Sequence, residues 1–149
     1  LLLWDDENYY LVAYDAKAGC MKHYRVDKMI RLSLTGEETD GEADYDSIDV
    51  AAYTKKTFGM FAGEEKSIQL LCDSSLAGVI IDRFGRDISM RTHGKDRVLV
   101  RAKIAVSPQF FGWLAGLCDR ARILAPEDVV MSYQEYLERI LHVYKEEEP

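Results

Sequence analysis

The chain has 149 residues, 48% of them hydrophobic, which is enough to bury the core of one ordinary domain or of two small ones. The formal net charge of −7 disfavours long-range attraction to DNA, but the excess acid lies almost wholly in residues 34–66, so a local basic pocket elsewhere is not excluded. The longest nearly apolar stretch, Phe110 to Cys118, is too short to span a membrane, so we expect no membrane segment.

The cysteines, Cys20, Cys72 and Cys118, are odd in number and far apart in the sequence. This argues against a disulfide framework and for a reducing compartment, so we expect a cytoplasmic protein. The histidines are equally scattered, and neither residue type occurs at metal-ligand spacing, so we expect no metal and no cofactor. The sequence opens on Leu1 without an initiator methionine or a basic leader, so we expect a further segment upstream.

Near the N-terminus, residues 1–4, 9–15 and 22–35 have the composition of β-strands. Turn-forming residues separate them at 5–8 and at 17–19, where Gly19 supplies the backbone freedom that a tight turn needs. The pattern predicts part of a small β-barrel or meander in which the second and third strands form a hairpin.

This predicted hairpin carries tyrosines beside an arginine and a histidine. Such residues can stack on a flat group and neutralise a phosphate, which predicts a ligand platform rather than a catalytic site. In an extended strand His23 and Arg25 share one face, and Lys28 falls on the side of Tyr24 unless a bulge intervenes. The residue pattern alone favours a simpler interpretation, in which Arg25 and Lys28 form ion pairs at a solvated strand edge.

The segment that follows is acidic and rich in turn-forming residues from Gly36 to Asp46. Ser47 to Thr54 is predicted to form one short helix with Ser47 as its cap, and the linker continues to about Lys66. The acidic residues Asp44, Asp46 and Asp49 have irregular spacing, which fits a solvated loop better than a calcium-binding loop.

From Ser67 onward strands and helices alternate, which indicates a second, α+β unit. We expect strands at 68–72, 88–90, 98–104 and 121–124. A helix after the first strand is capped by Asp73 or Ser74 and ends at Gly85, and its inner face carries Leu76, Val79, Ile80 and Phe84. A second helix begins at Ser107 and Pro108. The order β-α-β-β-α-β is the ferredoxin-like pattern. A final helix follows Pro126, with an apolar face of Val129, Tyr133, Tyr136, Leu137, Ile140 and Tyr144.

A basic stripe of Arg97, Arg101 and Lys103 is predicted on the face opposite the buried side of the 98–104 strand, with Arg91 beside it. The outward positions of this sheet lack the aromatic pair with which an RNA-recognition module stacks bases. The pattern therefore favours a solvated or dimer-facing sheet over an RNA-binding one.

The residues of the hairpin resemble those of WYL-domain transcriptional regulators, a bacterial family with a winged helix-turn-helix domain upstream. Tyr9-Tyr10-Leu11 is similar to the tripeptide that names the family, and residues 24–29 are similar to its second signature. Residues 58–64 resemble the family's linker, and residues 110–114 resemble its C-terminal extension, often called WCX.

The resemblance implies an α+β protein with a partial Sm-like or SH3-like β-barrel at residues 1–45, its N-terminal strand truncated. It also implies a helical linker at 46–66 and a ferredoxin-like WCX extension at 67–149. The implied role is effector sensing, with a nucleotide or a single-stranded nucleic acid as the ligand. The family's aromatic and basic signature positions fall on Tyr9, Tyr10, His23, Arg25 and Lys28. Promoter DNA would be bound only by the absent upstream domain.

No nucleophile with a neighbouring base, no paired-carboxylate site and no phosphate loop occurs at a telling spacing, so we expect no enzyme. The alternative function is a dimerisation scaffold without an effector, in which the extension and the final helix supply the interface of a homodimer.

Overall fold

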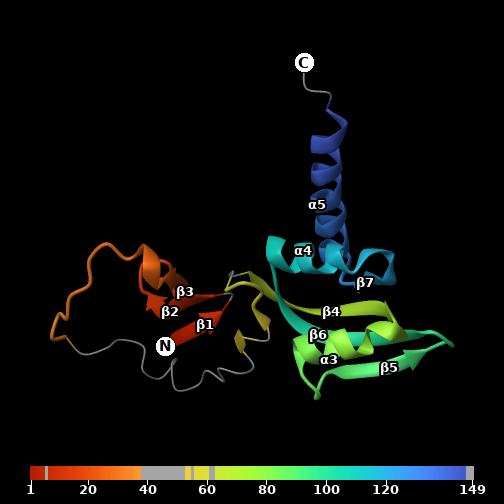
Figure 1. The fold of residues 1–149 in the computed structure, drawn as a ribbon, viewed down its shortest axis with the longest axis horizontal. Helices are drawn as coiled ribbons and strands as arrows, with labels where there is room; N and C mark the ends of the chain where they lie inside the picture. The colour runs from red at the N-terminus through yellow and green to blue at the C-terminus, as the bar shows by residue number, and fades with distance from the viewer. Residues whose placement is uncertain (6, 38–52, 55, 61–62, 147–149) are drawn as a thin grey trace. The chain divides into compact units, whose positions relative to one another are not determined.

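The computed structural model describes residues 1–5, 7–37, 53–54, 56–60 and 63–146. The chain divides into two compact units, Leu1–Ala62 and Gly63–Pro149, and each is described by itself. Both contain an antiparallel sheet, and the helices α3 (Ala77–Phe84), α4 (Pro108–Gly116) and α5 (Glu127–Lys145) belong to the second unit (Figure 1).

The first unit is built on three antiparallel strands, β1 (Leu2–Asp5), β2 (Asn8–Asp15) and β3 (Cys20–Arg25), in the order β1-β2-β3. This confirms the predicted hairpin and the strand before it. The three strands form an open sheet, and the described part of the chain contains no closed barrel.

The predicted third strand, residues 22–35, is too long. β3 ends at Arg25, and a 3-10 turn, η1 (Val26–Lys28), follows it, closed by a hydrogen bond from the Met29 N–H to the Val26 carbonyl oxygen at 3.1 Å. The alternating apolar residues that suggested a longer strand find nothing to pack against, because each is more than four-fifths exposed: Ile30, Leu32 and Leu34.

Among the described residues of this unit, Leu3, Val12 and Met60 form one buried cluster, and Tyr10 and Tyr53 are among the partly buried side chains packed against it. Phe58 is buried as well. The predicted helix at 47–54 lies outside the described residues except for Tyr53 and Thr54, which are helical, and the predicted acidic loop of Asp44, Asp46 and Asp49 lies wholly outside them.

The second unit runs in the order β-α-β-β-α-β-α, which confirms the predicted order of elements. They are β4 (Glu64–Asp73), the 3-10 turn η2 (Ser74–Leu76), α3 (Ala77–Phe84), β5 (Ser89–His93), β6 (Arg97–Val106), α4 (Pro108–Gly116), the 3-10 turn η3 (Cys118–Arg120), β7 (Ala121–Ala125) and α5 (Glu127–Lys145). The sheet order is β5-β6-β4-β7, and every neighbouring pair is antiparallel. β4 begins at Glu64, ahead of the strand predicted at 68–72 and three residues before Ser67, where the second unit was predicted to start. The assignment of this unit as ferredoxin-like stays a prediction.

One face of this sheet is buried because alternate residues of its two central strands are apolar. Ile68, Leu70 and Cys72 on β4 are fully buried, and so are Val100 and Ile104 on β6. The fully buried side chains of the helices and turns complete the core: Leu76, Ile80, Phe110 and Leu114. Burial raises the pKa of the Cys72 thiol to about 11, so this sulfur stays protonated at neutral pH.

The helix ends follow the predicted signals only in part. Ser107 caps α4, as expected, because its Oγ accepts a hydrogen bond from the Phe110 N–H at 3.3 Å. Gly85 ends α3 with a φ of 90°, which favours glycine. The predicted side-chain cap on α3 by Asp73 or Ser74 is wrong, because a 3-10 turn leads into the helix instead. Val79, predicted on the inner face, is 41% exposed.

The predicted apolar face of α5 is covered only over its first turns. Val129 is buried, and the centre of the Phe111 ring lies 5.3 Å from the centre of the Tyr133 ring and 5.5 Å from that of the Tyr136 ring. Farther along, Leu137 and Ile140 are each 40% exposed, and Figure 1 shows α5 projecting beyond α4 and β7. None of the helices in the described ranges is long and apolar enough to cross a membrane.

Candidate functional site

The pairing of the hairpin strands divides the predicted site residues between two faces. Tyr10 lies opposite Arg25, and Val12 lies opposite His23. Because directly paired residues share a face, Tyr10, His23 and Arg25 lie on the side of the sheet that buries Val12, and Tyr9 lies on the other. The predicted pairing of His23 with Arg25 on one face is confirmed, but Tyr9 cannot join them in one platform.

Asp27 and Asn8 both accept hydrogen bonds from the Arg25 guanidinium. Its Nε and Nη2 donate to Oδ1 and Oδ2 of Asp27, each at 2.9 Å, and Nη2 also donates to Oδ1 of Asn8 at 2.6 Å. The side chain of Arg25 remains 40% exposed. The hydrogen bonds from Arg25 are the largest cause that lowers the pKa of Asp27. The ion-pair interpretation of Arg25 is therefore correct for this structure, and it fixes the orientation of the guanidinium.

His23 lies deeper in the same face. Its Nε2 is 2.7 Å from the hydroxyl oxygen of Tyr53, and the centres of the two rings are 5.6 Å apart. Partial burial lowers the pKa of His23 and raises that of Tyr53, so both side chains favour their neutral forms. Sequence reasoning missed Tyr53, which is 30 residues away in the chain.

The prediction that Lys28 lies on the Tyr24 side of the strand is wrong, because β3 ends at Arg25, three residues before Lys28. It belongs to η1, its side chain is 73% exposed, and its Nζ is 3.7 Å from Oδ2 of Asp27. Asp27 therefore contacts both cations of the predicted site, Arg25 and Lys28.

The opposite face of the sheet carries three exposed aromatic side chains, Trp4, Tyr9 and Tyr24. Trp4 on β1 lies directly across from Tyr9 on β2, with ring centres 4.7 Å apart in an edge-on arrangement. Trp4 is 60% and Tyr9 52% exposed, and Tyr24 on β3 is exposed on the same face. Sequence reasoning did not single out Trp4, although the pairing of β1 with β2 could have placed it beside Tyr9.

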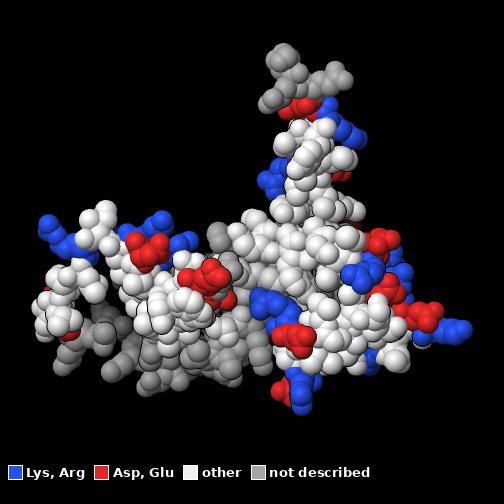
Figure 2. All heavy atoms as spheres, viewed as in Figure 1, with Lys and Arg blue, Asp and Glu red and all other residues white. Residues whose placement is uncertain are grey.

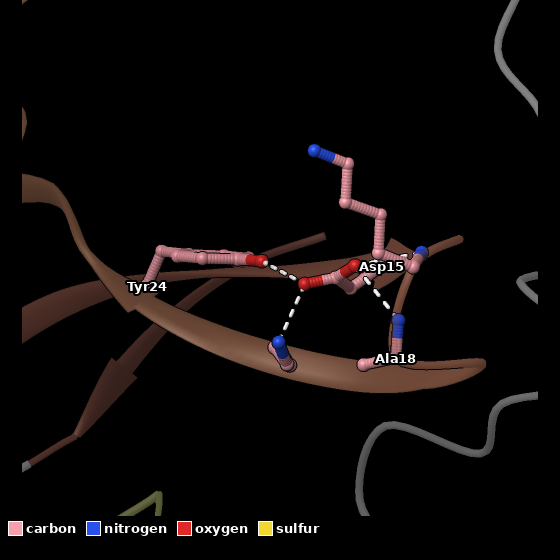
Figure 3. A network of polar contacts seen from close by, with 5 residues as sticks. Asp15, Ala18 and Tyr24 are labelled. Atoms are coloured by element: carbon pink, nitrogen blue, oxygen red, sulfur yellow. Dashed lines mark hydrogen bonds and ion pairs between the residues drawn. The ribbon is translucent and has the colours of Figure 1, made fainter.

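The hairpin turn is organised by Asp15 (Figure 3). Its Oδ1 accepts hydrogen bonds from the N–H groups of Lys17 and Ala18, and its Oδ2 accepts from Tyr24 at 3.2 Å and from Lys22 Nζ at 2.5 Å. The hydrogen bond from Lys22 is the largest of the contacts that lower the pKa of Asp15 to about 2. This network closes the turn and also fixes Tyr24 and Lys22 on the aromatic face.

The side chains of this site can bind two kinds of chemical group. A guanidinium held in a fixed plane can bind an oxyanion through two parallel hydrogen bonds, and exposed aromatic rings can stack on a base. Among the residues that the structure describes, no group of three or more histidine, cysteine, aspartate or glutamate side chains could hold a metal ion.

Comparison with known families assigns the second unit. The model of the WCX domain matches residues 64–141, which is more than half of the chain. The chain belongs to the WCX domain family. The match covers all of the second sheet and most of α5, and it leaves out the hairpin, for which the WYL-domain resemblance stays a prediction.

None of the curated proteins matches this WCX-family chain. Among solved structures, proteasome accessory factor B/C (PafBC) of Arthrobacter aurescens is similar over 98% of the chain, with 18% sequence identity and a TM-score of 0.44. The chain spans only 22% of the length of that protein.

Proposed function

We propose that this chain is the ligand-sensing and oligomerisation region of a bacterial helix-turn-helix transcriptional regulator, and that its hairpin binds a nucleotide or a single-stranded nucleic-acid effector. Two observations support the proposal: the WCX domain at residues 64–141, and ahead of it the residues at 9–11 and 24–29 that resemble WYL signatures. The role is a binding role, without catalysis.

The observation that carries the proposal is the two-point contact between the Arg25 guanidinium and the carboxylate of Asp27. Its guanidinium binds both oxygens of Asp27 in one plane, which is also the way in which an arginine binds two oxygens of a phosphate. Tyr10 and His23 lie on the same face of the hairpin. A phosphate group that displaced the Asp27 carboxylate would find the guanidinium already oriented, so little side-chain entropy would be lost on binding.

The regulatory consequence follows from linkage. A ligand changes the state of a regulator only as far as it binds one arrangement more tightly than another. We propose that the effector stabilises one arrangement of a homodimer and thereby alters DNA binding by the upstream domain.

The experiment is fluorescence anisotropy of a labelled single-stranded DNA titrated with residues 1–149, the Arg25→Gln variant and a charge-matched control, Lys17→Gln. Lys17 is an exposed cation at the hairpin turn of the same unit. Loss of roughly ten-fold or more in affinity for Arg25→Gln but not for Lys17→Gln supports the proposal, since a charge-assisted bidentate contact would be removed. Equal affinities of all three proteins, with the fold retained, contradict it.

The second candidate, a homodimerisation scaffold without an effector, is favoured by α5. Beyond its contacts with Phe111 the helix exposes Leu137, Ile140, Leu141, Val143 and Tyr144, and Figure 2 shows a largely uncharged surface along α5. Sedimentation equilibrium of the chain and of Ile140→Asp, with Gln134→Asp as the control on the same helix, tests it. A dimer that dissociates only in Ile140→Asp, together with no ligand binding, favours the scaffold.

A further inference from the structure

The open face of the WCX sheet collects basic side chains from three of its strands. Residues that pair across β4, β6, β5 and β7 share a face, and the face opposite the buried core contains every odd-numbered residue of β6. Its cations are all exposed, and we call them together the cationic sheet face: Arg91 on β5, Arg97, Arg101 and Lys103 on β6, and Arg122 on β7.

These five cations outnumber the carboxylates on their face, which are Glu65 and Asp73 on β4. Asp73 is paired with Arg97, with Oδ1 3.9 Å from Nε. Within the described residues the other four cations form no ion pair: Arg91, Arg101, Lys103 and Arg122. A chain of net charge −7 thus keeps an uncompensated positive area on one sheet.

The strands of the sheet set the distances between the charges. Arg101 and Lys103 are two residues apart on one strand, a separation of about 7 Å, and the neighbouring strands lie about 4.8 Å away on either side. Between the cations lie Leu71, which is buried, the half-buried Leu99 opposite it, and the uncharged polar residues Ser67 and Gln69. Positive groups therefore line β6, with one more on each of the edge strands β5 and β7 and none on β4.

We propose that the cationic sheet face binds the phosphate backbone of a single-stranded nucleic acid without reading its bases. Neutralisation of phosphates by lysine and arginine gives affinity regardless of sequence. His93 at the end of β5 is the one aromatic ring in the described part of this face, and no phenylalanine, tyrosine or tryptophan lies there for bases to stack on, so base recognition is not expected. A flexible strand can follow cations across a twisted sheet, whereas a rigid duplex would meet fewer of them.

This inference revises the sequence prediction of a solvated or dimer-facing sheet. Arg122, which the predicted basic stripe did not include, is the reason for the revision. It pairs with Leu71 across β4 and β7, which extends the cations to the far side of the sheet from Arg91. The site lies wholly within the second unit and does not depend on the hairpin or on Arg25.

The test is the salt dependence of binding by the whole chain to a labelled oligothymidylate of about 15 nucleotides. The variant carries Arg101→Gln, Lys103→Gln and Arg122→Gln, and its charge-matched control carries Arg86→Gln, Arg139→Gln and Lys145→Gln, which remove exposed cations elsewhere in the same unit. Each lost phosphate contact lowers the slope of log K against log salt by about 0.7, so we expect a fall of about 2 in the variant and at least a ten-fold loss of affinity at low salt. The control should keep most of the affinity and slope.

An unchanged affinity and slope in the variant, with circular dichroism showing an intact fold, overturns the proposal, and so does the absence of any binding by the unmodified chain at low salt. An oligouridylate should bind with the same slope, because the contacts are to phosphates. Tighter binding to a duplex of the same length overturns the single-strand assignment. The Arg25→Gln variant distinguishes the two sites. If only Arg25→Gln loses affinity for the oligonucleotide, the hairpin is the binding site and the sheet proposal is overturned. If only the triple variant of the sheet loses affinity, the sheet proposal is supported.

Discussion

Arg25 and Asp27 are joined by two parallel hydrogen bonds of 2.9 Å, although only one residue separates them in the chain. The pair forms at the end of β3, where the backbone leaves the sheet and enters η1. The same carboxylate lies 3.7 Å from Lys28 Nζ. An anion that bound Arg25 through Nε and Nη2 would therefore have to displace Asp27, which accepts hydrogen bonds from both atoms.

Asp27→Asn should strengthen binding of a single-stranded DNA by roughly three- to ten-fold, because it removes the competing charge while keeping the shape of the side chain. Anisotropy titration at low and physiological salt measures this. Glu37→Gln, which removes an exposed carboxylate elsewhere in the same unit, is the control. Weaker binding in Asp27→Asn would instead show that the carboxylate orients Arg25 and does not block it.

His23 predicts a pH dependence of the first unit. Burial lowers the pKa of His23 below its ordinary value of 6.5, so the unfolded chain binds more protons than the folded one. Stability from neutral His23 is fully present above about pH 6.5 and is lost as the pH falls from there to the folded-state pKa. NMR titration of the ring should give the lowered pKa, and melting of the Leu3 and Val12 signals should show the loss of stability.

In His23→Gln this loss below about pH 6.5 should shrink, whereas His93→Gln, which replaces an exposed histidine on β5, should leave it unchanged. An equal pH dependence in His23→Gln would assign the effect to other groups.

Two glycines of the second unit should respond in opposite directions to alanine. At Gly63 a Cβ would lie 2.0 Å from the backbone oxygen of Val106, so Gly63→Ala should force β4 and β6 apart and destabilise the unit by about 1 to 3 kcal/mol. At the exposed helical Gly78 a Cβ meets nothing within 4 Å, so Gly78→Ala should stabilise it by about 1 kcal/mol. Urea unfolding followed by Trp113 fluorescence measures both, and the same sign of change in the two variants would contradict the geometry.

The cap of α4 should contribute measurably to stability. Ser107 is buried, and its Oγ is the acceptor for the Phe110 N–H, so Ser107→Ala leaves that donor unsatisfied and should cost about 1 kcal/mol. Ser107→Thr keeps an acceptor and should recover part of the loss. The same urea unfolding experiment measures both variants, and Ser89→Ala, at an exposed serine, is the control. An unchanged free energy of unfolding in Ser107→Ala would contradict a stabilising cap.

The second unit was predictable because its signals are local and agree with one another. The alternation of Val98, Val100 and Ile104, the Ser107-Pro108 start of a helix and Gly85 after another are short-range patterns that packing reinforces. The predicted cap of α3 was wrong because Asp73 ends β4 and Ser74 begins a 3-10 turn, where the Ser74 N–H donates to the carbonyl oxygen of Asp96.

The candidate site was harder to predict, because it depends on contacts that spacing does not encode. Alternation correctly placed His23 and Arg25 on one face, but it could not show that Tyr53, from outside the hairpin, would meet His23. The alternation at Ile30 to Leu34 suggested a strand, although no partner in the described sheet pairs with it. The basic stripe was recognised, but Arg122 joined it only through the pairing of β7 with β4.

Because Cys72 is buried, thiol-reactive dyes can label the other two cysteines of this sequence selectively. Cys72 is shielded and its thiol stays protonated, whereas Cys20 in the first unit and Cys118 in the second are exposed. A thiol-reactive donor and acceptor dye pair would therefore attach once to each unit without any engineered cysteine. Energy transfer between the dyes could then follow the separation of the units in solution, with and without a nucleic acid.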